Sequence, residues 1–170
     1  MSIDNKIISI DNAMLIVDSI VLCYGHFNLI HPGHLRYLQH AKTLANKLIV
    51  VIRSDEELDK DSFGQHFTED ERAESVANLQ IVDGVIILNQ LTLDKLVDIV
   101  KPSVLVLGKE FEQKQPKYIS SAISAVRKQG KTVFHAGEAH YATSNLLHGN
   151  VLDIEKTSVD SFKAICKNHK

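Results

Sequence analysis

The stretch YGHFNLIHPGH, residues 24–34, lies between an apolar run and a helical pattern, and it sets the organisation of the chain. The run Ile20–Cys23 before it predicts a buried strand, and residues 33–46 after it carry apolar side chains at the spacing of one helix face. Pro32 and Gly33 favour a tight start to this helix. The order of strand, loop and helix places free backbone N–H groups beside the loop, which is an arrangement typical of phosphate binding.

Short apolar runs and helical patterns alternate through the rest of the chain. Further strands are predicted at residues 47–52, 85–88, 104–107 and 132–134, and further helices at 68–80, 93–100 and 116–130. This alternation predicts an α/β fold: a Rossmann-like, doubly wound parallel sheet of about five strands with helices on both faces. Such sheets bind ligands at the carboxyl ends of their strands, near the topological switch point. We therefore expect the loop at residues 24–34 to lie at the ligand site.

The length of 170 residues and the hydrophobic content of 44% suit one compact core. We expect a single main domain over residues 1–150. Residues 151–170 read as a C-terminal helical extension that either docks on this domain or leads to a further one. The charged, irregular stretch 55–70 is interpreted either as a solvated surface loop or as a lid over the site.

Composition excludes several classes of protein. The net charge of −2 lacks the basic character of a general nucleic-acid binder. The chain shows neither an apolar run of about 20 residues nor the pattern of a signal peptide, so we expect a cytoplasmic protein that does not enter membranes. Cys23 and Cys166 form no disulfide or zinc pattern.

His31 and His34 are the candidate catalytic residues. They lie three positions apart at the start of the predicted helix, so both rings can face the same side of its first turn. Imidazoles placed there can donate hydrogen bonds to phosphate oxygens, and donors aimed at a transition state commonly contribute about 3–4 kcal/mol each. Two histidines make an incomplete metal site, so no protein-bound metal is predicted.

The motif Gly25-His26-Phe27-Asn28-x-x-His31-Pro32-Gly33-His34 resembles the G-x-F-D-x-x-H-x-G-H signature of the cytidylyltransferase-like nucleotidyltransferases. The resemblance covers about residues 20–147. The order of segments is similar to glycerol-3-phosphate cytidylyltransferase and to the adenylyltransferase domain of heptose-phosphate ADP synthases. It implies transfer of CMP or AMP from CTP or ATP to a phosphorylated sugar or polyol, with Mg²⁺ carried on the triphosphate and pyrophosphate released. It is compatible with a homodimer, although nothing in the sequence itself indicates one.

Segments elsewhere in the chain extend this resemblance. Lys42 is similar to a helix lysine that reaches the triphosphate, with a solvated helix residue as the alternative. Arg72 is similar to an arginine near the phosphates, with an ordinary pair to Glu69 as the alternative. Residues 108–111 resemble an element that contacts base and ribose, and residues 141–147 resemble a phosphate-binding helix start whose hydroxyls could serve only as a cap. The resemblance thus implies catalytic roles for His31, His34 and Lys42, and nucleotide binding by Tyr24, Gly25, His26, Phe27, Asn28, Gly33, Arg72, Gly108, Glu110, Phe111, Thr143 and Ser144.

Two positions depart from the family pattern. Asn28 stands where the signature has aspartate, and Leu107 stands where the base-contacting element has lysine. These departures keep two alternatives open: a catalytically weak nucleotide-binding regulatory domain, which would bind without turnover, and an interaction module, which would bind no nucleotide. Class I aminoacyl-tRNA synthetases share a related histidine pair, but this chain is too short for one and has no basic extension for tRNA.

Overall fold

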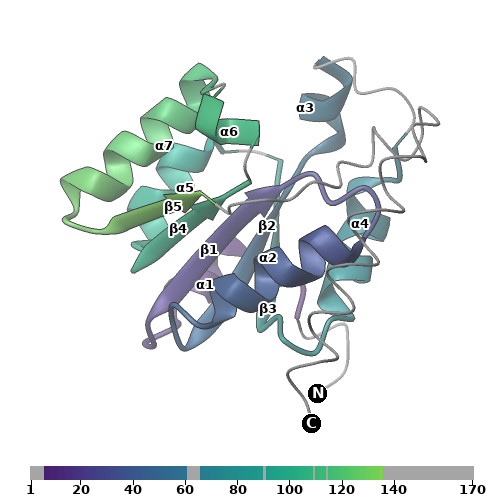
Figure 1. The fold of residues 1–170 in the computed structure, drawn as a ribbon, viewed down its shortest axis with the longest axis horizontal. Coiled ribbons are helices and arrows are strands. Elements are labelled where there is room, and N and C mark those ends of the chain that lie inside the picture. Colours follow the sequence, from purple (N-terminus) through teal and green to yellow (C-terminus); the bar gives the residue numbers. More distant parts are fainter. Residues whose placement is uncertain (1–5, 61–65, 90, 109, 114, 136–170) are drawn as a thin grey trace, which may run out of the picture. The chain divides into compact units, whose positions relative to one another are not determined.

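The computed structural model describes residues 6–60, 66–89, 91–108, 110–113 and 115–135. These residues form a five-stranded sheet built from β1 (Ile20–Gly25), β2 (Lys47–Arg53), β3 (Gly84–Leu88), β4 (Val104–Leu107) and β5 (Thr132–His135). The strand order is β3-β2-β1-β4-β5, and every pairing is parallel (Figure 1). In the centre, Leu22 pairs with Ile49 on one side and with Leu105 on the other. The predicted parallel sheet is confirmed, and the switch in strand order falls between β1 and β4.

Helices cover both faces of this sheet (Figure 1). One face carries α2 (Pro32–Lys42) and α4 (Glu69–Ala77), and the other carries α1 (Ile10–Met14), α5 (Leu93–Val100) and α7 (Lys117–Lys128). Side chains of β1 alternate between the two resulting cores, with Val21 and Cys23 on the α2 side and Leu22 and Tyr24 on the other. Because both faces are covered, every residue of β1 is buried, which explains its continuous apolar pattern.

The helix after the histidine loop begins at Pro32 and ends at Lys42, so it is shorter than the predicted range 33–46. The capping box predicted for α4 is present. The hydroxyl of Thr68 accepts a hydrogen bond from the N–H of Glu71, and the carboxylate of Glu71 accepts one from the N–H of Thr68. α5 has the predicted bounds. Sequence periodicity therefore placed the longer helices correctly and left errors of a few residues at their ends.

Two short helices that sequence periodicity did not predict lie at the carboxyl edge of the sheet. They are α3 (Asp55–Lys60), which follows β2, and α6 (Glu110–Gln113), which follows β4. The first turn of α3 carries Asp55, Glu56 and Glu57, whose negative charges suit the positive end of the helix dipole. The beginning of the stretch expected to be irregular, residues 55–70, is therefore helical.

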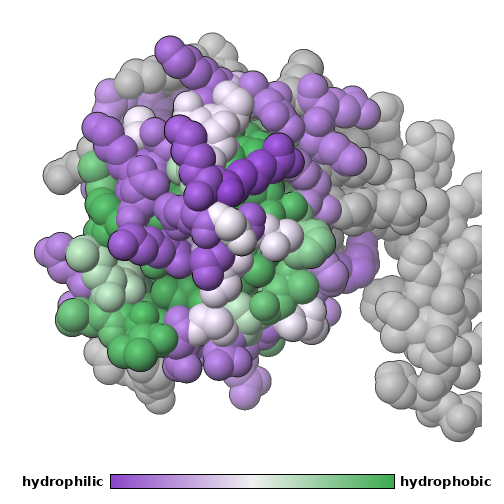
Figure 2. Space-filling model, turned by 90° about the vertical axis from the view of Figure 1, so that its left-hand side faces the viewer, coloured by the Kyte–Doolittle hydropathy of each residue, from purple (hydrophilic) through white to green (hydrophobic). Residues whose placement is uncertain are grey.

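The strand β5 forms one edge of the sheet. Thr132 and Phe134 on it are exposed, and the Phe134 residue retains 42% of its accessible surface. Figure 2 views the molecule from this side and shows apolar atoms among hydrophilic side chains. Unlike β1, this strand contributes little to the two buried cores.

Some predictions fall on residues that the structure does not describe. The C-terminal extension at residues 151–170 and the domain limit at residue 150 both lie outside the described residues. Among the residues that are described, no helix has the length and apolar character needed to cross a bilayer.

Candidate functional site

The loop between β1 and α2 lies at the carboxyl edge of the sheet, beside the switch in strand order. A Cβ added to Gly25 would lie 2.9 Å from the ring of Phe27, so the close approach of this ring favours glycine there. Phe27 itself adopts a left-handed backbone conformation with φ of 49°, which is uncommon for a residue with a bulky side chain. Strained backbone of this kind clusters at functional sites.

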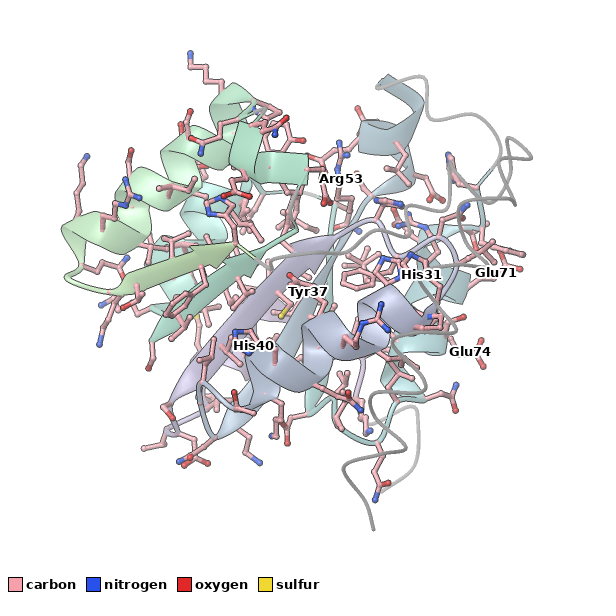
Figure 3. The ribbon with its side chains drawn as sticks, in the orientation of Figure 1. His31, Tyr37, His40, Arg53, Glu71 and Glu74 are labelled. Carbon is pink, nitrogen blue, oxygen red and sulfur yellow. The ribbon has the colours of Figure 1, made fainter. Side chains whose placement is uncertain are left out.

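His31 and His34 stack on each other at the start of α2, with ring centroids 3.9 Å apart and planes inclined by 26°. The ring of Phe27 supports His34 from the protein side, with centroids 4.9 Å apart. Phe27 is buried in the core, so it acts as a support for the histidine rather than as a surface for a ligand. The two predicted catalytic histidines are therefore brought together as the sequence indicated (Figure 3 labels His31).

Hydrogen bonds to the backbone assign the protons of both rings. His31 is the N-cap of α2, and the N–H of Gly33 donates to its Nδ1 at 3.1 Å. The hydrogen of neutral His31 must therefore sit on Nε2. Nδ1 of His34 lies 3.0 Å from the carbonyl oxygen of Leu29, which can only accept, so the hydrogen of neutral His34 sits on Nδ1. The stacked rings are opposite tautomers.

A third imidazole, His26, lies beside them, with its ring centroid 6.5 Å from that of His34. Burial, then the charges of Arg53 and Arg72, lower the pKa of His26 to about 4. Burial, then the neighbouring His31 and His26, lower the pKa of His34 to about 3, although its bond to Leu29 acts in the opposite direction. The three imidazoles bring no negative charge to the site, and Arg53 and Arg72 act on His26 as positive charges, so these surroundings favour an anion.

Arg72 holds the loop in place. Its guanidinium donates to the carbonyl oxygens of His26 at 2.6 Å, Arg53 at 2.7 Å and Phe67 at 2.9 Å, and to the carboxylate of Asp55 at 2.7 Å. The residue is only 1% exposed. It therefore joins the end of β2, the histidine loop and the segment before α4 by side-chain hydrogen bonds.

This geometry corrects both readings of Arg72 made from the sequence. Its partner is Asp55 and not Glu69, whose carboxylate instead accepts from the N–H of Asp55 at 2.9 Å. Its side chain is buried among protein groups, so it is not placed to contact phosphate. Asp55 directly follows a buried parallel strand, where such sheets place residues of a ligand site, but its bond to Arg72 was not predicted.

Asn28 connects the same two segments. Its Oδ1 accepts a hydrogen bond from the N–H of Phe67 at 2.8 Å. An aspartate would offer the same acceptor, so the departure from the family signature preserves this contact and removes one negative charge. Asn28 therefore has a structural role in this chain, since it joins the histidine loop to the segment before α4.

The other side of the site follows β4. Tyr24 pairs with Leu107 in the sheet, so Gly25 and Gly108 leave neighbouring strands at the same edge. A Cβ on Gly108 would overlap the carboxylate of Glu110, so the absence of a side chain allows this approach. The side chain of Leu107 is fully buried in β4, which places it in the core and not at the ligand edge.

Aromatic side chains pack in the core next to this edge, on the face of the sheet that α5 and α7 cover. The ring of Tyr24 packs 6.0 Å from that of Phe111, and its hydroxyl lies 3.4 Å from a carboxylate oxygen of Glu57. The guanidinium of Arg53 lies over the ring of Tyr118, 5.6 Å from its centroid. Tyr24 and Phe111 thus belong to the core beneath the site, whereas the sequence had placed them in contact with nucleotide.

Lys42 does not lie at this site. It ends α2, about eight residues or 12 Å along the helix from His34. Its ammonium donates to Asp83, which precedes β3 at the amino edge of the sheet, and to the carbonyl oxygen of Asn46. Figure 3 shows the two ends of the helix through the labels of His31 and His40. The predicted catalytic role of Lys42 is therefore corrected to a structural one.

Lys42→Met should lower the free energy of unfolding by about 1 kcal/mol, and the melting temperature by roughly 2–4 °C, without changing nucleotide affinity. Burial alone would raise the pKa of Asp83, but its bonds to Lys42 and the Leu48 N–H outweigh burial and lower that pKa. The contribution of the pair is therefore complete above the unfolded pKa of aspartate and is lost as the pH falls through the lowered folded value. Urea denaturation at several pH values tests this, with the exposed Lys95→Met as control. Weakened nucleotide binding in Lys42→Met would contradict the assignment.

The remaining predicted residues fall outside this description. Thr143 and Ser144 lie outside the described residues, so the phosphate-binding role implied for them stays a prediction. Within the described part of the chain, no group of three or more His, Cys, Asp or Glu side chains is arranged to hold a metal ion. The residues that the structure brings to the carboxyl edge are Gly25, His26, Asn28, His31, Gly33, His34, Gly108 and Glu110.

Known proteins resemble this chain in sequence. A model of the cytidylyltransferase-like family matches residues 22–145. The bifunctional protein HldE of Helicobacter pylori is 34% identical over 114 residues, which are 65% of this chain and 25% of that protein. A FAD synthase from Picrophilus torridus is 34% identical over 88 residues, which are 52% of this chain and 63% of that protein. The chain thus spans about a quarter of the length of the HldE protein.

A solved structure shares both fold and sequence. It is a lipopolysaccharide core biosynthesis protein from Thermoplasma volcanium, with a TM-score of 0.58 and 27% identity. The match covers 74% of this chain and 99% of that one.

Proposed function

This chain belongs to the cytidylyltransferase-like family, and on that premise we propose that it is a nucleotidyltransferase. It transfers AMP or CMP from the nucleoside triphosphate to a phosphorylated sugar or polyol and releases pyrophosphate. An oxygen of the acceptor phosphate attacks the α-phosphorus. The bond from that phosphorus to the bridging oxygen breaks, and pyrophosphate leaves with the electron pair.

The stacked pair of His31 and His34 carries this proposal. The pair lies at the first turn of a helix and at the switch point of a parallel sheet, where two independent features favour an anionic ligand. His31 presents an Nε2–H without a net charge, which suits donation to a phosphate oxygen as charge moves onto pyrophosphate. Mg²⁺ binds triphosphate oxygens and water readily, and would enter as part of the nucleotide.

The nature of the acceptor rests on resemblance alone. The order of segments resembles enzymes that act on glycerol phosphate and heptose phosphate. The match to a FAD synthase adds flavin mononucleotide to the acceptors worth testing. The described residues include no feature that selects among these acceptors or between adenine and cytosine.

Nucleotide binding and turnover test the proposal directly. Magnesium ATP or magnesium CTP at about a hundredfold its Kd should stabilise the protein by ~2.7 kcal/mol, which raises the melting temperature by roughly 5–10 °C. The shift should be lost in His34→Ala and kept in His40→Ala, an exposed histidine at the other end of the same helix. Pyrophosphate release is then measured with the three acceptors.

Each contrary outcome points to a different class of protein. A thermal shift without pyrophosphate release from any acceptor would favour a regulatory nucleotide-binding domain. No shift with either nucleotide would favour an interaction module and would contradict the proposed enzyme.

A further inference from the structure

The opposite tautomers of His31 and His34 give the two rings different chemistry toward phosphate. Neutral His31 offers a hydrogen on Nε2, because its Nδ1 accepts from Gly33. Neutral His34 offers only a lone pair on Nε2, because its hydrogen is held on Nδ1 by the carbonyl oxygen of Leu29. A phosphate oxygen also carries only lone pairs, so it can accept from His31 and is repelled by Nε2 of neutral His34.

We propose that His34 takes up one proton on Nε2 when the magnesium complex of a nucleoside triphosphate binds, and that His31 does not. This inference rests on the proposed function, since it concerns binding of the same nucleotide. The doubly protonated His34 ring keeps its bond to Leu29 and gains a charge-assisted bond to a phosphate oxygen. His31 needs no proton, because its neutral ring already presents a donor.

The charges around His34 explain why this proton is absent before the nucleotide arrives. His31 of α2 and His26 of the loop after β1 act on His34 directly. Arg36 of α2 acts on His31, and Arg53 of β2 and Arg72 of α4 act on His26. Each of these groups is neutral or positive, and the carboxylates of Asp55 and Glu57 are paired with Arg72 and Arg53. Burial, then His31 and His26, lower the pKa of His34, so its ring is neutral in the free protein at neutral pH. A bound polyanion brings negative charge next to His34 itself, and it therefore favours the protonated ring.

A second arrangement would also satisfy a phosphate at His34. The ring could remain neutral and move its hydrogen from Nδ1 to Nε2, but it would then lose its bond to Leu29 and leave that carbonyl oxygen without this donor. Tautomer exchange binds no proton from solution, whereas the proposed arrangement binds one. The two are therefore separated by counting protons.

Isothermal titration calorimetry in buffers of different ionisation enthalpy counts these protons. Magnesium ATP and magnesium CTP are titrated between about pH 7 and pH 8, above the second phosphate pKa of about 6, so the ligand is already ionised. Two asparagine variants provide matched controls. His34→Asn keeps an amide N–H that can donate to Leu29 and has no equivalent of Nε2. His31→Asn keeps an oxygen that can cap α2 and also lacks Nε2.

The wild-type protein should take up about one proton per nucleotide, which requires the bound nucleotide to raise the pKa of His34 from about 3 to above the pH of the titration. The Kd should then rise about tenfold per pH unit. His34→Asn should take up none and show a flat pH profile. His31→Asn should bind more weakly and still take up about one proton. Saturable binding without proton uptake in the wild type, or uptake that persists in His34→Asn, would overturn the inference. Absence of saturable binding by either nucleotide would contradict the proposed function itself.

The starting tautomer is tested separately, in the free protein. Nitrogen-15 NMR of the imidazole rings should show the hydrogen on Nδ1 in His34 and on Nε2 in His31. A free His34 with its hydrogen on Nε2 would overturn the inference without any nucleotide present.

Discussion

Arg72→Met should lower the free energy of unfolding by about 3–5 kcal/mol, because each buried acceptor left without its donor costs about 1–3 kcal/mol. The substitution keeps an unbranched side chain in the core and removes every hydrogen-bond donor. Asp55 and the carbonyl oxygens of His26 and Arg53 would all lose the donor that Arg72 supplies. The melting temperature should fall by roughly 10 °C or more, as measured by thermal or urea denaturation.

Two further variants separate the geometry of Arg72 from its charge. Arg72→Lys keeps the charge but cannot reproduce the planar fork that reaches four acceptors, so its stability should lie between those of wild type and Arg72→Met. Arg127→Met, on the exposed last turn of α7, removes the same chemical group from the surface and should change stability by less than about 0.5 kcal/mol. Equal losses in Arg72→Met and Arg127→Met would show that the hydrogen-bond network has no special weight.

His31→Ala should lower the rate of pyrophosphate release by a factor on the order of 10²–10³, which is the loss seen when one transition-state donor is removed. The same substitution removes the N-cap of α2, so it should also reduce stability by about 1 kcal/mol. The rate is measured with the acceptor that supports turnover in the wild type, and stability by urea denaturation.

His31→Asn separates these two effects. Its side-chain oxygen can accept from the N–H of Gly33 as Nδ1 of His31 does, so stability should stay close to that of the wild type. Its rate should fall as far as that of His31→Ala, because neither variant has the Nε2 donor. A His31→Asn enzyme with wild-type turnover would show that His31 only caps the helix.

The fold could be predicted from sequence because its signals are local and repeated. The apolar runs at Ile20–Cys23 and residues 47–52 follow from burial on both faces of the sheet. Thr68 and Glu71 show a helix start within four residues. The helices α1, α3 and α6 have five, six and four residues, which is too short for a helical period to be recognised.

The candidate site could be located from sequence, but its internal contacts could not. His31 and His34 lie on one turn, so their spacing alone brought them together. Arg72 binds carbonyl oxygens of residues 5, 19 and 46 positions away, and backbone acceptors carry no residue type that a sequence could show. The misplacement of Lys42 was avoidable, since eight residues of helix necessarily carry it away from His34.

The parallel pairing of β1 with β4 affects when the site can form as the chain is made. Val21 pairs with Leu48 early in the chain and with Val104 only after β3 and α5 have been synthesised. A nascent chain that ends before β4 can assemble the β1–β2–β3 half of the sheet and the histidine loop, but it lacks Gly108 and Glu110 on the other side. Such distant parallel pairings are intrinsically slow to form. Completion of the site therefore waits for the strand pairing with the largest sequence separation in the sheet, which makes it a reporter of β1–β4 pairing during translation.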